Sequence, residues 1–536
     1  MATLSNVLDP RGLMNDIPQA SLAPRPADLT GKTIYIIESW PEKSGFEDAV
    51  ARVTSYLSAK YDDIKFLYAK RVWYSSDDPA LWAEVLSKAD AYIYFAAPSC
   101  STTAYAITWP ARSLERKGLP GVVLIYEYLE ADAIISQDRE GMWIRYVKTP
   151  YPYEDNTEEE KNDIPRRLEQ ELLRPLEGRE LDSGMRTPQQ PPRYAPAGTA
   201  EDLHNYFYSQ GWTDGLPIIL PTEERVNAML KGTSHSPGEV IVTNMAPEGR
   251  KVTVEKAAVT AVMAGAEPSY FPVILAAIEI MGRDQFYHAT SKSTNSFSYL
   301  QVVNGPIRNE IGMNGSVYAL GPGNKANAVI GRAHRLALIN LGGAEVGKNL
   351  MGVQGNVSSY TFAIPENEEA SPWCSYAVHQ GFKPDESVLT ILTGGLAHTG
   401  NYMLVEDGME KCIEAIKRFE FNAGMTLLLA PQRARNLSEK CGCKTYNDVL
   451  NLVMKLSSMT IAELKECGIM RRVEQDIKLG QNTYPAEYLK LPDDALVEAY
   501  PRCETSIIVV GDPAGSDTIQ GWALYRPRST SIDKWR

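Results

Sequence analysis

The chain has 536 residues, which exceeds one ordinary domain and predicts two or three. Its hydrophobic content of 44% is typical of a soluble globular protein, and its net charge of −13 argues against a nucleic-acid partner, because phosphate binding needs clustered Lys and Arg. The sequence has no apolar run of about 18 residues and no charged-then-apolar leader, so we expect no membrane span, no secretory signal and a cytoplasmic location.

The first 176 residues divide into an arm and an α/β domain. Residues 1–30 contain several prolines and little periodicity, so we expect an extended arm that packs on a neighbour, and we expect the protein to be a homo-oligomer. Residues 31–176 alternate buried strands with helices, which predicts a doubly wound parallel sheet of the flavodoxin-like or Rossmann-like kind. The connection after the first strand, ESWPEKSG, lacks GxGxxG, so a dinucleotide-binding motif is absent from the sequence. The expected elements are Lys32–Glu38, Phe46–Lys60, Asp63–Ala69, Pro79–Ala89, Ala91–Ala96, a helix capped among residues 101–103 and ending near Lys117, Pro120–Glu127, Trp143–Val147, and a helix Asp163–Leu173 with Pro165 in its first turn.

The stretch Asp90–Glu127 contains the first candidate site. Cys100 lies where one of the expected strands has ended and a helix begins. Parallel sheets bind ligands at that edge, and the helix dipole there lowers the pKa of a thiol. We therefore predict a reactive Cys100, with Ser99, Ser101 and Thr102 binding the substrate beside it. The alternative is that Cys100 is a small packed residue in a tight turn.

The arrangement strand–xxSC–helix–LExxGxP resembles the UGSC family of (seleno)proteins and, more distantly, the selenoprotein B component of glycine, sarcosine and betaine reductases. In those families a selenocysteine or cysteine lies three residues before a second cysteine, and the pair performs reductive thiol or selenol chemistry. The matching tetrapeptide here is Ala97-Pro98-Ser99-Cys100, which keeps the second cysteine and has alanine at the first redox position. The resemblance extends to about residue 150. It implies thiol chemistry without a dithiol cycle inside this motif.

Residues 177–198 are rich in proline and polar residues and predict a linker, or alternatively an ordered strap over the surface. Residues 199–536 form the predicted C-terminal α/β domain, a catalytic or substrate domain made of one unit or two subdomains. Its expected elements are helices at Thr199–Gly211, after Thr222, from Val254 to Gly265, Pro268–Met281, Lys325–Leu341, Met409–Phe419, Ala434–Lys440, Tyr446–Leu456 and Ile461–Cys467, strands at Val388–Leu392, Thr426–Ala430 and Ser506–Gly511, and a polar loop at Thr243–Arg250. The segments WTDGLP, NMAPEGR, VNGPI, GPGNKAN and ENEEASPW resemble uncharacterised proteins that accompany UGSC-type proteins.

The glycine-marked segment Asn295–Asn349 predicts a site for a carboxylate or phosphate of a small organic anion. The loop Leu320–Asn324 leads into a helix, and free backbone N–H groups at a helix start favour an anion. The loop does not have P-loop spacing. Alternatively, the glycines only allow close helix packing. The cations of that helix are Lys325, Arg332, His334 and Arg335, and the substrate-binding candidates are Asn304, Lys325, Asn327 and Arg332.

Two further segments supply candidates for acid–base chemistry. The run Pro365–Trp373 places carboxylates beside apolar residues, where one of them with a raised pKa would move a proton. The segment GGLAHTGN places a histidine in a glycine-rich turn, which suits a catalytic or ligand histidine. The alternatives are a solvated acidic loop and a packed or solvated histidine. The candidates are Glu366, Glu368 or Glu369, with Trp373 for the substrate, and His398.

Seven sparse cysteines suit free thiols in a reducing compartment better than a disulfide framework. Cys441 and Cys443, with Cys467 and Cys503, fit a structural zinc site poorly, because CxC without a nearby histidine lacks the usual ligand pairs. We therefore predict no metal site, and the sequence leaves any cofactor unknown.

These observations favour an enzyme of small-molecule metabolism with its site between the two halves. The expected reaction is at a carbon–heteroatom bond, carbon–sulfur included, of a small anionic substrate, in the lyase or thiol-dependent transferase or reductase classes. Cys100 would supply the thiolate and the second half the acid–base group. One alternative is a degenerate redox domain that serves as a scaffold, with lyase or hydrolase chemistry wholly in the C-terminal domain. Another is a non-catalytic ligand-binding or assembly protein.

Overall fold

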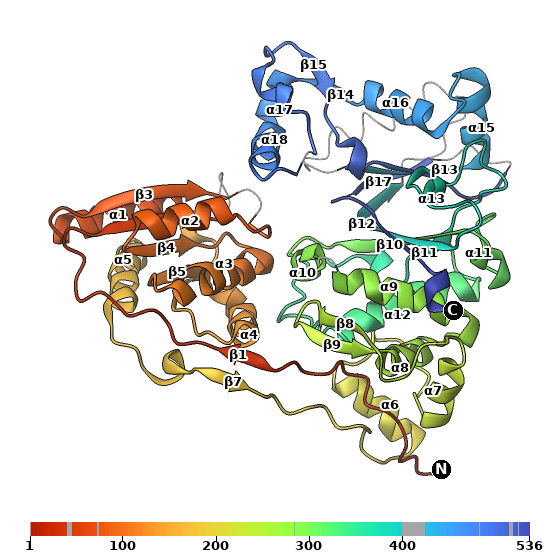
Figure 1. The fold of residues 1–536 in the computed structure, drawn as a ribbon, viewed down its shortest axis with the longest axis horizontal. Helices are drawn as coiled ribbons and strands as arrows, with labels where there is room; N and C mark the ends of the chain where they lie inside the picture. The colour runs from red at the N-terminus through yellow and green to blue at the C-terminus, as the bar shows by residue number, and fades with distance from the viewer. Residues whose placement is uncertain are drawn as a thin grey trace.

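The computed structural model describes residues 2–39, 46–71, 74–283, 285–398, 424–481, 483–513, 518–523 and 525–536, and for Cys100, Gln285, Phe286, 396–398, 518–520, 522 and 523 it describes the backbone alone. Figure 1 shows two domains side by side, with long extended segments running between them along one edge. The smaller N-terminal domain is α/β, and the larger C-terminal domain contains a mixed sheet and helices. The predicted fold class is therefore confirmed. None of the described helices is long and apolar enough to cross a membrane.

The N-terminal domain is a five-stranded parallel sheet with helices on both faces. Its elements are β2 (Thr33–Glu38), α1 (Glu47–Lys60), β3 (Lys65–Lys70), α2 (Pro79–Lys88), β4 (Ala91–Phe95), α3 (Cys100–Ser113), β5 (Gly121–Tyr126), α4 (Glu130–Glu140), β6 (Tyr146–Thr149) and α5 (Glu158–Leu173). The strand order β3-β2-β4-β5-β6 is the flavodoxin-like order. Helices α1 and α5 share one hydrophobic cluster with the sheet, and α2, α3 and α4 share the other. The alternation of strands and helices in the sequence thus predicted this doubly wound sheet.

Two helix starts in this domain differ from the prediction. α3 begins at Cys100, because Ser99 has an extended backbone (φ −145°) and takes the N-cap position, so the cap predicted among residues 101–103 is wrong. α5 begins at Glu158, because Thr157 and Glu160 form a capping box before it. Pro165 therefore lies inside the helix and not in its first turn.

The N-terminal arm and the proline-rich connection run antiparallel to each other between the domains (Figure 1). β1 (Ile17–Gln19) pairs with β7 (Gly184–Arg186), and a further bridge joins Leu8 to Tyr194. Leu13 also bridges to Lys251, so the arm lies along the C-terminal domain of its own chain. Part of the connection at 177–198 is thus paired with the arm.

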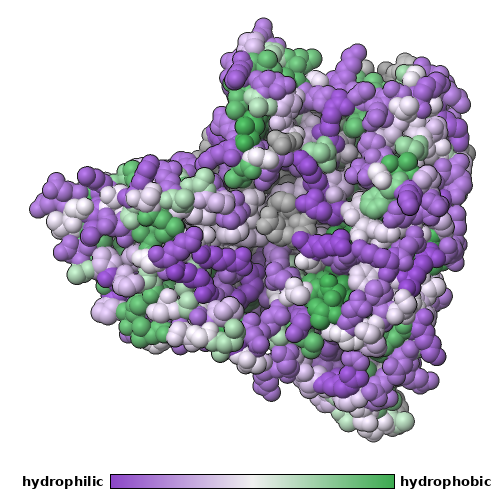
Figure 2. Space-filling view, in the orientation of Figure 1, coloured by the Kyte–Doolittle hydropathy of each residue, from purple (hydrophilic) through white to green (hydrophobic). Residues whose placement is uncertain are grey.

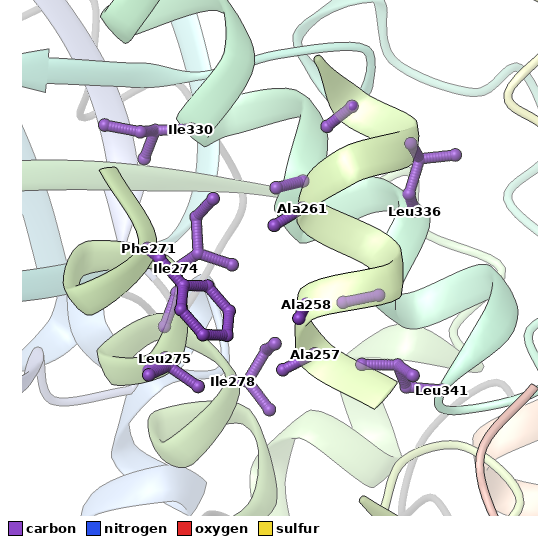
Figure 3. Close-up of a cluster of buried hydrophobic side chains, with 14 of the residues drawn as sticks. Ala257, Ala258, Ala261, Phe271, Ile274, Leu275, Ile278, Ile330, Leu336 and Leu341 are labelled. Carbon is purple, nitrogen blue, oxygen red and sulfur yellow. The ribbon is translucent and has the colours of Figure 1, made fainter. Parts of the chain in front are cut away.

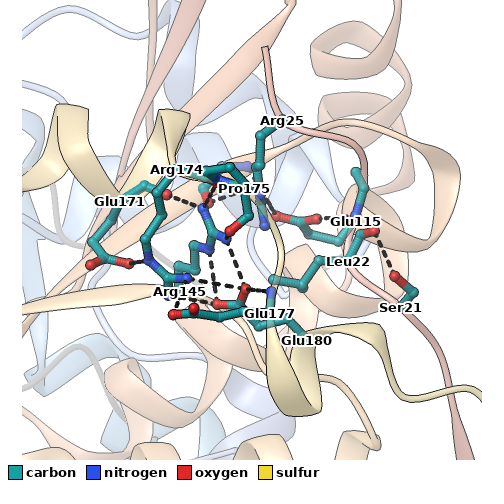
Figure 4. A network of polar contacts seen from close by, with 12 residues as sticks. Ser21, Leu22, Arg25, Glu115, Arg145, Glu171, Arg174, Pro175, Glu177 and Glu180 are labelled. Atoms are coloured by element: carbon teal, nitrogen blue, oxygen red, sulfur yellow. Dashed lines mark hydrogen bonds and ion pairs between the residues drawn. The ribbon is translucent and has the colours of Figure 1, made fainter. Parts of the chain in front are cut away.

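A buried polar network fixes both segments to the N-terminal domain (Figure 4). The Arg145 guanidinium donates to the two carboxylate oxygens of Glu180 at 2.9 and 2.8 Å and to three backbone carbonyls. Burial raises the pKa of Glu180, but hydrogen bonds led by that from Arg145 outweigh it and lower this pKa to about 2. On the arm, Arg25 pairs with Glu115 at 2.9 Å, and the Leu22 backbone donates to the Glu180 carbonyl. The arm and the connection therefore have fixed positions where they leave the sheet.

The C-terminal domain is built on a seven-stranded mixed sheet, in the order β11-β10-β12-β17-β13-β16 with β18 beside β12. Its elements are α6 (Ala200–Ser209), α7 (Glu223–Leu230), β8 (Val240–Met245), β9 (Arg250–Thr253), α8 (Val254–Ala264), α9 (Phe271–Arg283), α10 (Gln285–Ser291), β10 (Ser298–Asn304), α11 (Ile307–Glu310), α12 (Lys325–Asn340), β11 (Ala363–Pro365), α13 (Tyr376–His379), β12 (Val388–His398), β13 (Gly424–Leu429), α15 (Pro431–Lys440), α16 (Tyr446–Leu456), β14 (Ser458–Thr460), α17 (Ile461–Glu466), α18 (Ile469–Lys478), β15 (Leu496–Glu498), β16 (Ser506–Val509), β17 (Thr518–Ala523) and β18 (Arg528–Ser531). Helices α8, α9 and α12 pack on one face of the sheet, and α15 to α18 pack on the other.

Two predictions for this domain are corrected. The segment Thr243–Arg250, expected as a polar loop, belongs largely to the hairpin of β8 and β9, whose register is irregular. β12 continues to His398 instead of ending at Leu392, because it pairs first with β10 and then with β17, so His398 ends a strand and does not lie in a glycine turn. The helix predicted at Met409–Phe419 lies outside the described residues.

The larger hydrophobic cluster of the C-terminal domain forms where α8 packs on α9 and α12 (Figure 3). α8 contributes small side chains such as Ala257 and Ala261, and α9 fills the space with large ones such as Phe271 and Ile278. Alanines allow the two helices to approach closely, while the large residues supply most of the buried apolar area. On the face shown in Figure 2, by contrast, hydrophobic side chains lie in small groups among hydrophilic ones.

Replacing Ile278 by alanine tests this core. Ile278 is 1% exposed, so the change removes buried methyl groups and leaves a cavity. We expect a loss of about 2–5 kcal/mol in the free energy of unfolding, measured by denaturant titration. The control is Val353→Ala, at a side chain that is 81% exposed, which should change stability by less than about 0.5 kcal/mol. Equal effects of the two variants would contradict this description of the core.

Candidate functional site at the domain interface

The strand order of the N-terminal sheet reverses between β2 and β4, and open parallel sheets bind ligands at the carboxyl ends of such strands. Cys100 is the first helical residue after β4, so it lies at this edge, where α3 begins. Ser39 follows β2 at the same edge, is fully buried, and has a hydroxyl with no hydrogen-bond partner among the described residues. The edge therefore combines a helix start, a cysteine and a buried polar group.

Hydroxyl side chains surround the start of α3. The hydroxyls of Ser99 and Ser101 lie 2.9 Å apart, and Ser101 also contacts the Tyr74 hydroxyl at 3.0 Å. Thr102 donates to the carbonyls of Ala97 and Ser99 and so closes the turn before the helix. The three predicted substrate-binding residues thus lie next to Cys100, with Thr102 already engaged by the backbone.

The C-terminal domain covers α3. All side chains from Ser101 to Ala111 are buried, and Ala289 of α10 shares a hydrophobic cluster with Ile107 of α3 and Ala133 of α4. A helix that is buried all round needs a second layer over its outer face. Here that layer is supplied by α10, which Figure 1 shows on the side of the C-terminal domain nearest the N-terminal sheet.

A buried ion pair crosses this interface. The Lys292 ammonium, directly after α10, lies 3.0 Å from Asp132 of α4, and the two side chains are 1% and 0% exposed. Lys292 is also 3.4 Å from the Ser136 hydroxyl. Burial raises the pKa of Asp132, and the positive charge of Lys292 opposes that rise. A lysine and an aspartate removed from water in this way form a candidate acid–base pair.

The register of α3 and α4 places this pair beside Cys100. The two helices follow neighbouring parallel strands and run side by side, with Arg139 donating to the Thr108 hydroxyl at 3.0 Å. Asp132 lies seven residues before Arg139, and Ser101 lies seven residues before Thr108, which is about two turns along each helix. Asp132 is therefore next to the first turn of α3.

Polar contacts continue along the interface beyond this pair. Arg139 also lies 3.5 Å from His288 of α10, whose other ring nitrogen is 3.2 Å from the Asn244 carbonyl. Burial, assisted by the charge of Arg139, lowers the pKa of His288 to about 3, so this histidine is neutral. A cavity of about 610 Å³ opens beside Arg139 and is lined by residues of both domains.

A second contact between the domains involves the loop that contains Tyr74, whose hydroxyl lies against Ser101. Tyr525 of the C-terminal domain hydrogen-bonds to Ser75, next to Tyr74, and it has a left-handed backbone (φ +69°) that bulky residues rarely adopt. Lys478 lies 3.6 Å from Asp78 in the following turn. The C-terminal domain thus also contacts the loop whose Tyr74 hydroxyl lies against Ser101.

The predicted acidic residues form a cluster elsewhere in the C-terminal domain. Asn304 donates to Glu366 at 2.6 Å and to Glu368 at 3.0 Å, while Arg308 contacts Glu368 at 3.2 Å and Glu369 at 2.6 Å. Glu366 also accepts from a backbone N–H at 2.7 Å. Burial raises the pKa of Glu366 to about 7, although these hydrogen bonds act to lower it. Every member has protein partners that join neighbouring segments, so the cluster is well suited to holding the fold together.

The other predicted substrate-binding residues in this domain also have protein partners. Lys325 is 57% exposed and pairs with Glu267 at 2.7 Å. It does not belong to the cluster that Asn304 forms with the carboxylates. Arg332 pairs with Asp214 at 2.8 Å. The remaining two make backbone contacts: Asn327 with Asn314 and Ala319, and Trp373 with the Cys443 carbonyl.

The predicted site residues do not form one site. Val388 at the start of β12 pairs with Asn304, whereas His398 ends the same strand ten residues later. At about 3.3 Å per residue the two ends are roughly 33 Å apart, so His398 and the Glu366 cluster cannot act on one small substrate. Figure 1 places α11, which follows Asn304, on the side of the domain away from the N-terminal sheet.

Sequence reasoning missed Asp132 and Lys292. Neither residue belongs to a motif, and each is an ordinary charged residue of a helix or its end in the sequence. Only the packing of α10 on α3 and α4 buries them against each other. In the sequence, the only sign of this pair would have been two charged residues among otherwise apolar neighbours. The sequence alone does not show that these two charges lie together.

These features define a two-domain α/β protein in which a second domain packs against α3 and α4 of a flavodoxin-like domain. The family model of the UGSC family matches residues 6–178, which span most of the arm and the whole flavodoxin-like domain. The predicted resemblance of the N-terminal domain to the UGSC family is thus confirmed. No curated protein and no solved structure matches the chain.

The raised pKa of Glu366 makes stability depend on pH. Because its pKa in the folded protein, about 7, exceeds its ordinary value of 4.5, the native state binds this proton more tightly. The resulting stability is fully present below about pH 4.5 and is lost as pH rises through about 7. We expect the melting temperature of the wild type to fall over this range relative to Glu366→Gln, as measured by thermal unfolding at several pH values.

The matched control is Glu369→Gln. Hydrogen bonding from Arg308 lowers the pKa of Glu369 to about 2, so its contribution changes only below its ordinary value of 4.5 and should be constant across the tested range. If the melting temperatures of the wild type and Glu366→Gln change in parallel with pH, Glu366 keeps an ordinary pKa.

Proposed function

We propose that this protein is an enzyme that acts at a carbon–heteroatom bond, carbon–sulfur included, of a small anionic substrate. The Cys100 thiolate would be the nucleophile, and Asp132 with Lys292 the proton-handling pair. The observation that carries this proposal is the buried ion pair from two domains beside the first turn of α3. The UGSC match over residues 6–178 supports the thiol part.

The proposed step uses these groups in sequence. The thiolate sulfur forms a bond to the substrate carbon, and the carbon–heteroatom bond breaks with its electron pair leaving on the heteroatom. The Lys292 ammonium donates a proton to that leaving atom, and Asp132 holds the ammonium in position while staying ionised. The start of α3 favours both the thiolate and a negative substrate group, because its N–H groups and dipole are positive there.

A second candidate places chemistry in the C-terminal domain alone, with the N-terminal domain as a degenerate redox scaffold. Alanine at position 97 favours it, as does Glu366, which is buried with a pKa near 7 next to residues of α13. A non-catalytic binding protein is a third candidate. We also propose that the protein is a homo-oligomer, although the arm contacts its own chain here.

Selective alkylation distinguishes a thiolate from a merely accessible thiol. Cys374, Cys467 and Cys503 are exposed, and partial burial raises the pKa of each of these thiols. If reactivity follows thiolate character, iodoacetamide at about pH 7 should label Cys100 first in the native protein, as read by peptide mass spectrometry. Labelling of the three exposed thiols before Cys100 would remove the nucleophile from this proposal.

The double variant Asp132→Leu with Lys292→Met separates the chemical role of the ion pair from its structural role. Replacing both charges by apolar groups of similar size often leaves stability unchanged, whereas removing one costs about 3–5 kcal/mol. We expect the double variant to fold, with Cys100 alkylated more slowly at about pH 7 because the Lys292 charge no longer favours the thiolate. An unchanged pH profile of Cys100 alkylation in the folded double variant would contradict the proposed role.

A further inference from the structure

The C-terminal domain contains a cavity of about 770 Å³ that none of the preceding chemistry uses. It lies between the second half of α12, the segment 290–299 and the segment 344–360. Small-molecule sites usually have volumes of about 300–1,000 Å³ with apolar walls and few polar groups. This cavity has that size, and Phe297, Leu338 and Val357 contribute apolar surface to it.

Arg335 supplies a positive charge to this cavity that lacks a carboxylate partner in the described part of the chain. Its Nε donates to the Ser359 carbonyl at 2.9 Å, and it belongs to no ion pair there. Arg335 is half-buried, and burial lowers the pKa of its guanidinium. A charge in such a place is costly unless an anion or hydrogen-bond acceptors compensate it.

The two carboxylates that line the same cavity are already paired. Asp214 accepts from Arg332 at 2.8 and 2.9 Å, and Glu345 pairs with Lys348 at 2.6 Å on the surface. Asp214 attracts the Arg335 charge, but neither carboxylate forms an ion pair with Arg335 among the described residues. The cavity therefore has in its wall a positive charge without an ion-pair partner of its own.

Ser291 is a buried polar residue in the wall of this cavity. Its side chain is 3% exposed and lines the cavity, yet its hydroxyl has no hydrogen-bond partner among the residues that the structure describes. Buried hydroxyls normally have partners, but this one is enclosed in the wall and is not open to the cavity, so a ligand would reach it only if the wall moved. The Arg335 charge and the apolar wall are what define the ligand, which should carry both an anionic group and an apolar body.

We propose that this cavity binds a small organic carboxylate, with the carboxylate on the Arg335 guanidinium and the apolar body against Phe297 and Leu338. The planar fork of an arginine matches a carboxylate in a bidentate arrangement, which favours this group over a neutral amide. The site differs from the one first expected on this helix, because Lys325 lies outside the cavity lining. It is independent of the thiol chemistry proposed for Cys100.

Calorimetry with matched probes tests this site on the full chain. Benzoate and hexanoate should bind the wild type at least about tenfold more tightly than benzamide and hexanamide, which have the same shape without the charge. Inorganic phosphate should bind more weakly than either carboxylate, since it has no apolar body. Binding of phosphate alone, or equal binding of acids and amides, would overturn the proposal.

Two arginine variants and two controls complete the experiment. Arg335→Met should weaken benzoate binding at least about tenfold, and Arg335→Lys should recover part of it, because the charge returns without the fork. Lys325→Met, on the same helix, should bind benzoate like the wild type, and Cys100→Ser should do so too. Equal binding by Arg335→Met would remove the site, while loss of binding in Lys325→Met would assign it to the helix start instead. If Arg335→Met does not fold, the comparison of acids with amides on the wild type decides.

Discussion

The ion pair of Lys292 and Asp132 constrains how the two domains meet. Both charges are taken out of water, and their mutual attraction offsets that cost only when the distance and the surrounding contacts are right. Each residue belongs to a different domain, so neither domain can bury its charge alone. The orientation of α10 on α3 and α4 is therefore specified by charge as well as by the packing of small residues such as Ala289 and Ala133.

The arm and the connection support this orientation because both are fixed at their two ends. On the C-terminal domain, the buried Lys256 ammonium donates to the Asp9 carbonyl of the arm at 2.7 Å. On the N-terminal domain, Arg25 of the arm and Glu180 of the connection belong to the buried network around Glu115 and Arg145. Two antiparallel segments anchored in this way limit how far the domains can separate. The arm also contributes to the interface directly, because Met14–Ile17 line the cavity beside Arg139.

The sequence predicted the local features of the N-terminal domain well, because period and length distinguish its buried strands from its amphipathic helices. It also placed Cys100 at the start of a helix, since a strand, a Pro-containing break and a helix follow one another there. It failed where pairing between distant segments decides the structure. β12 is long because β10 and β17 both pair with it, and the glycines near His398 gave no sign of this.

The same contrast between local features and contacts of distant segments applies to the candidate site. Residues next to Cys100 in the chain are also next to it in space, as the hydroxyls of Ser99 and Ser101 show. The acidic cluster, in contrast, looked catalytic in the sequence because carboxylates gathered beside apolar residues. In the structure those carboxylates accept hydrogen bonds from Asn304 and Arg308, and only Glu366 among them is buried.

Buried polar groups without protein partners are more informative than the polar residues that have them. Among the described residues, Ser39 and Thr103 hold such hydroxyls near the carboxyl edge of the first sheet, and Ser291 holds one in the wall of the cavity beside Arg335. Burying an unpaired polar group lowers stability, but the hydroxyls of Tyr92 and Tyr94 inside the core are unpaired too, so such a group supports a site only where a cavity or a charged residue adjoins it. Lys292 directly follows Ser291, so the short segment after α10 borders the cavity with one residue and holds the inter-domain ion pair with the next. Adjacent residues of one short segment therefore belong to two different proposed sites.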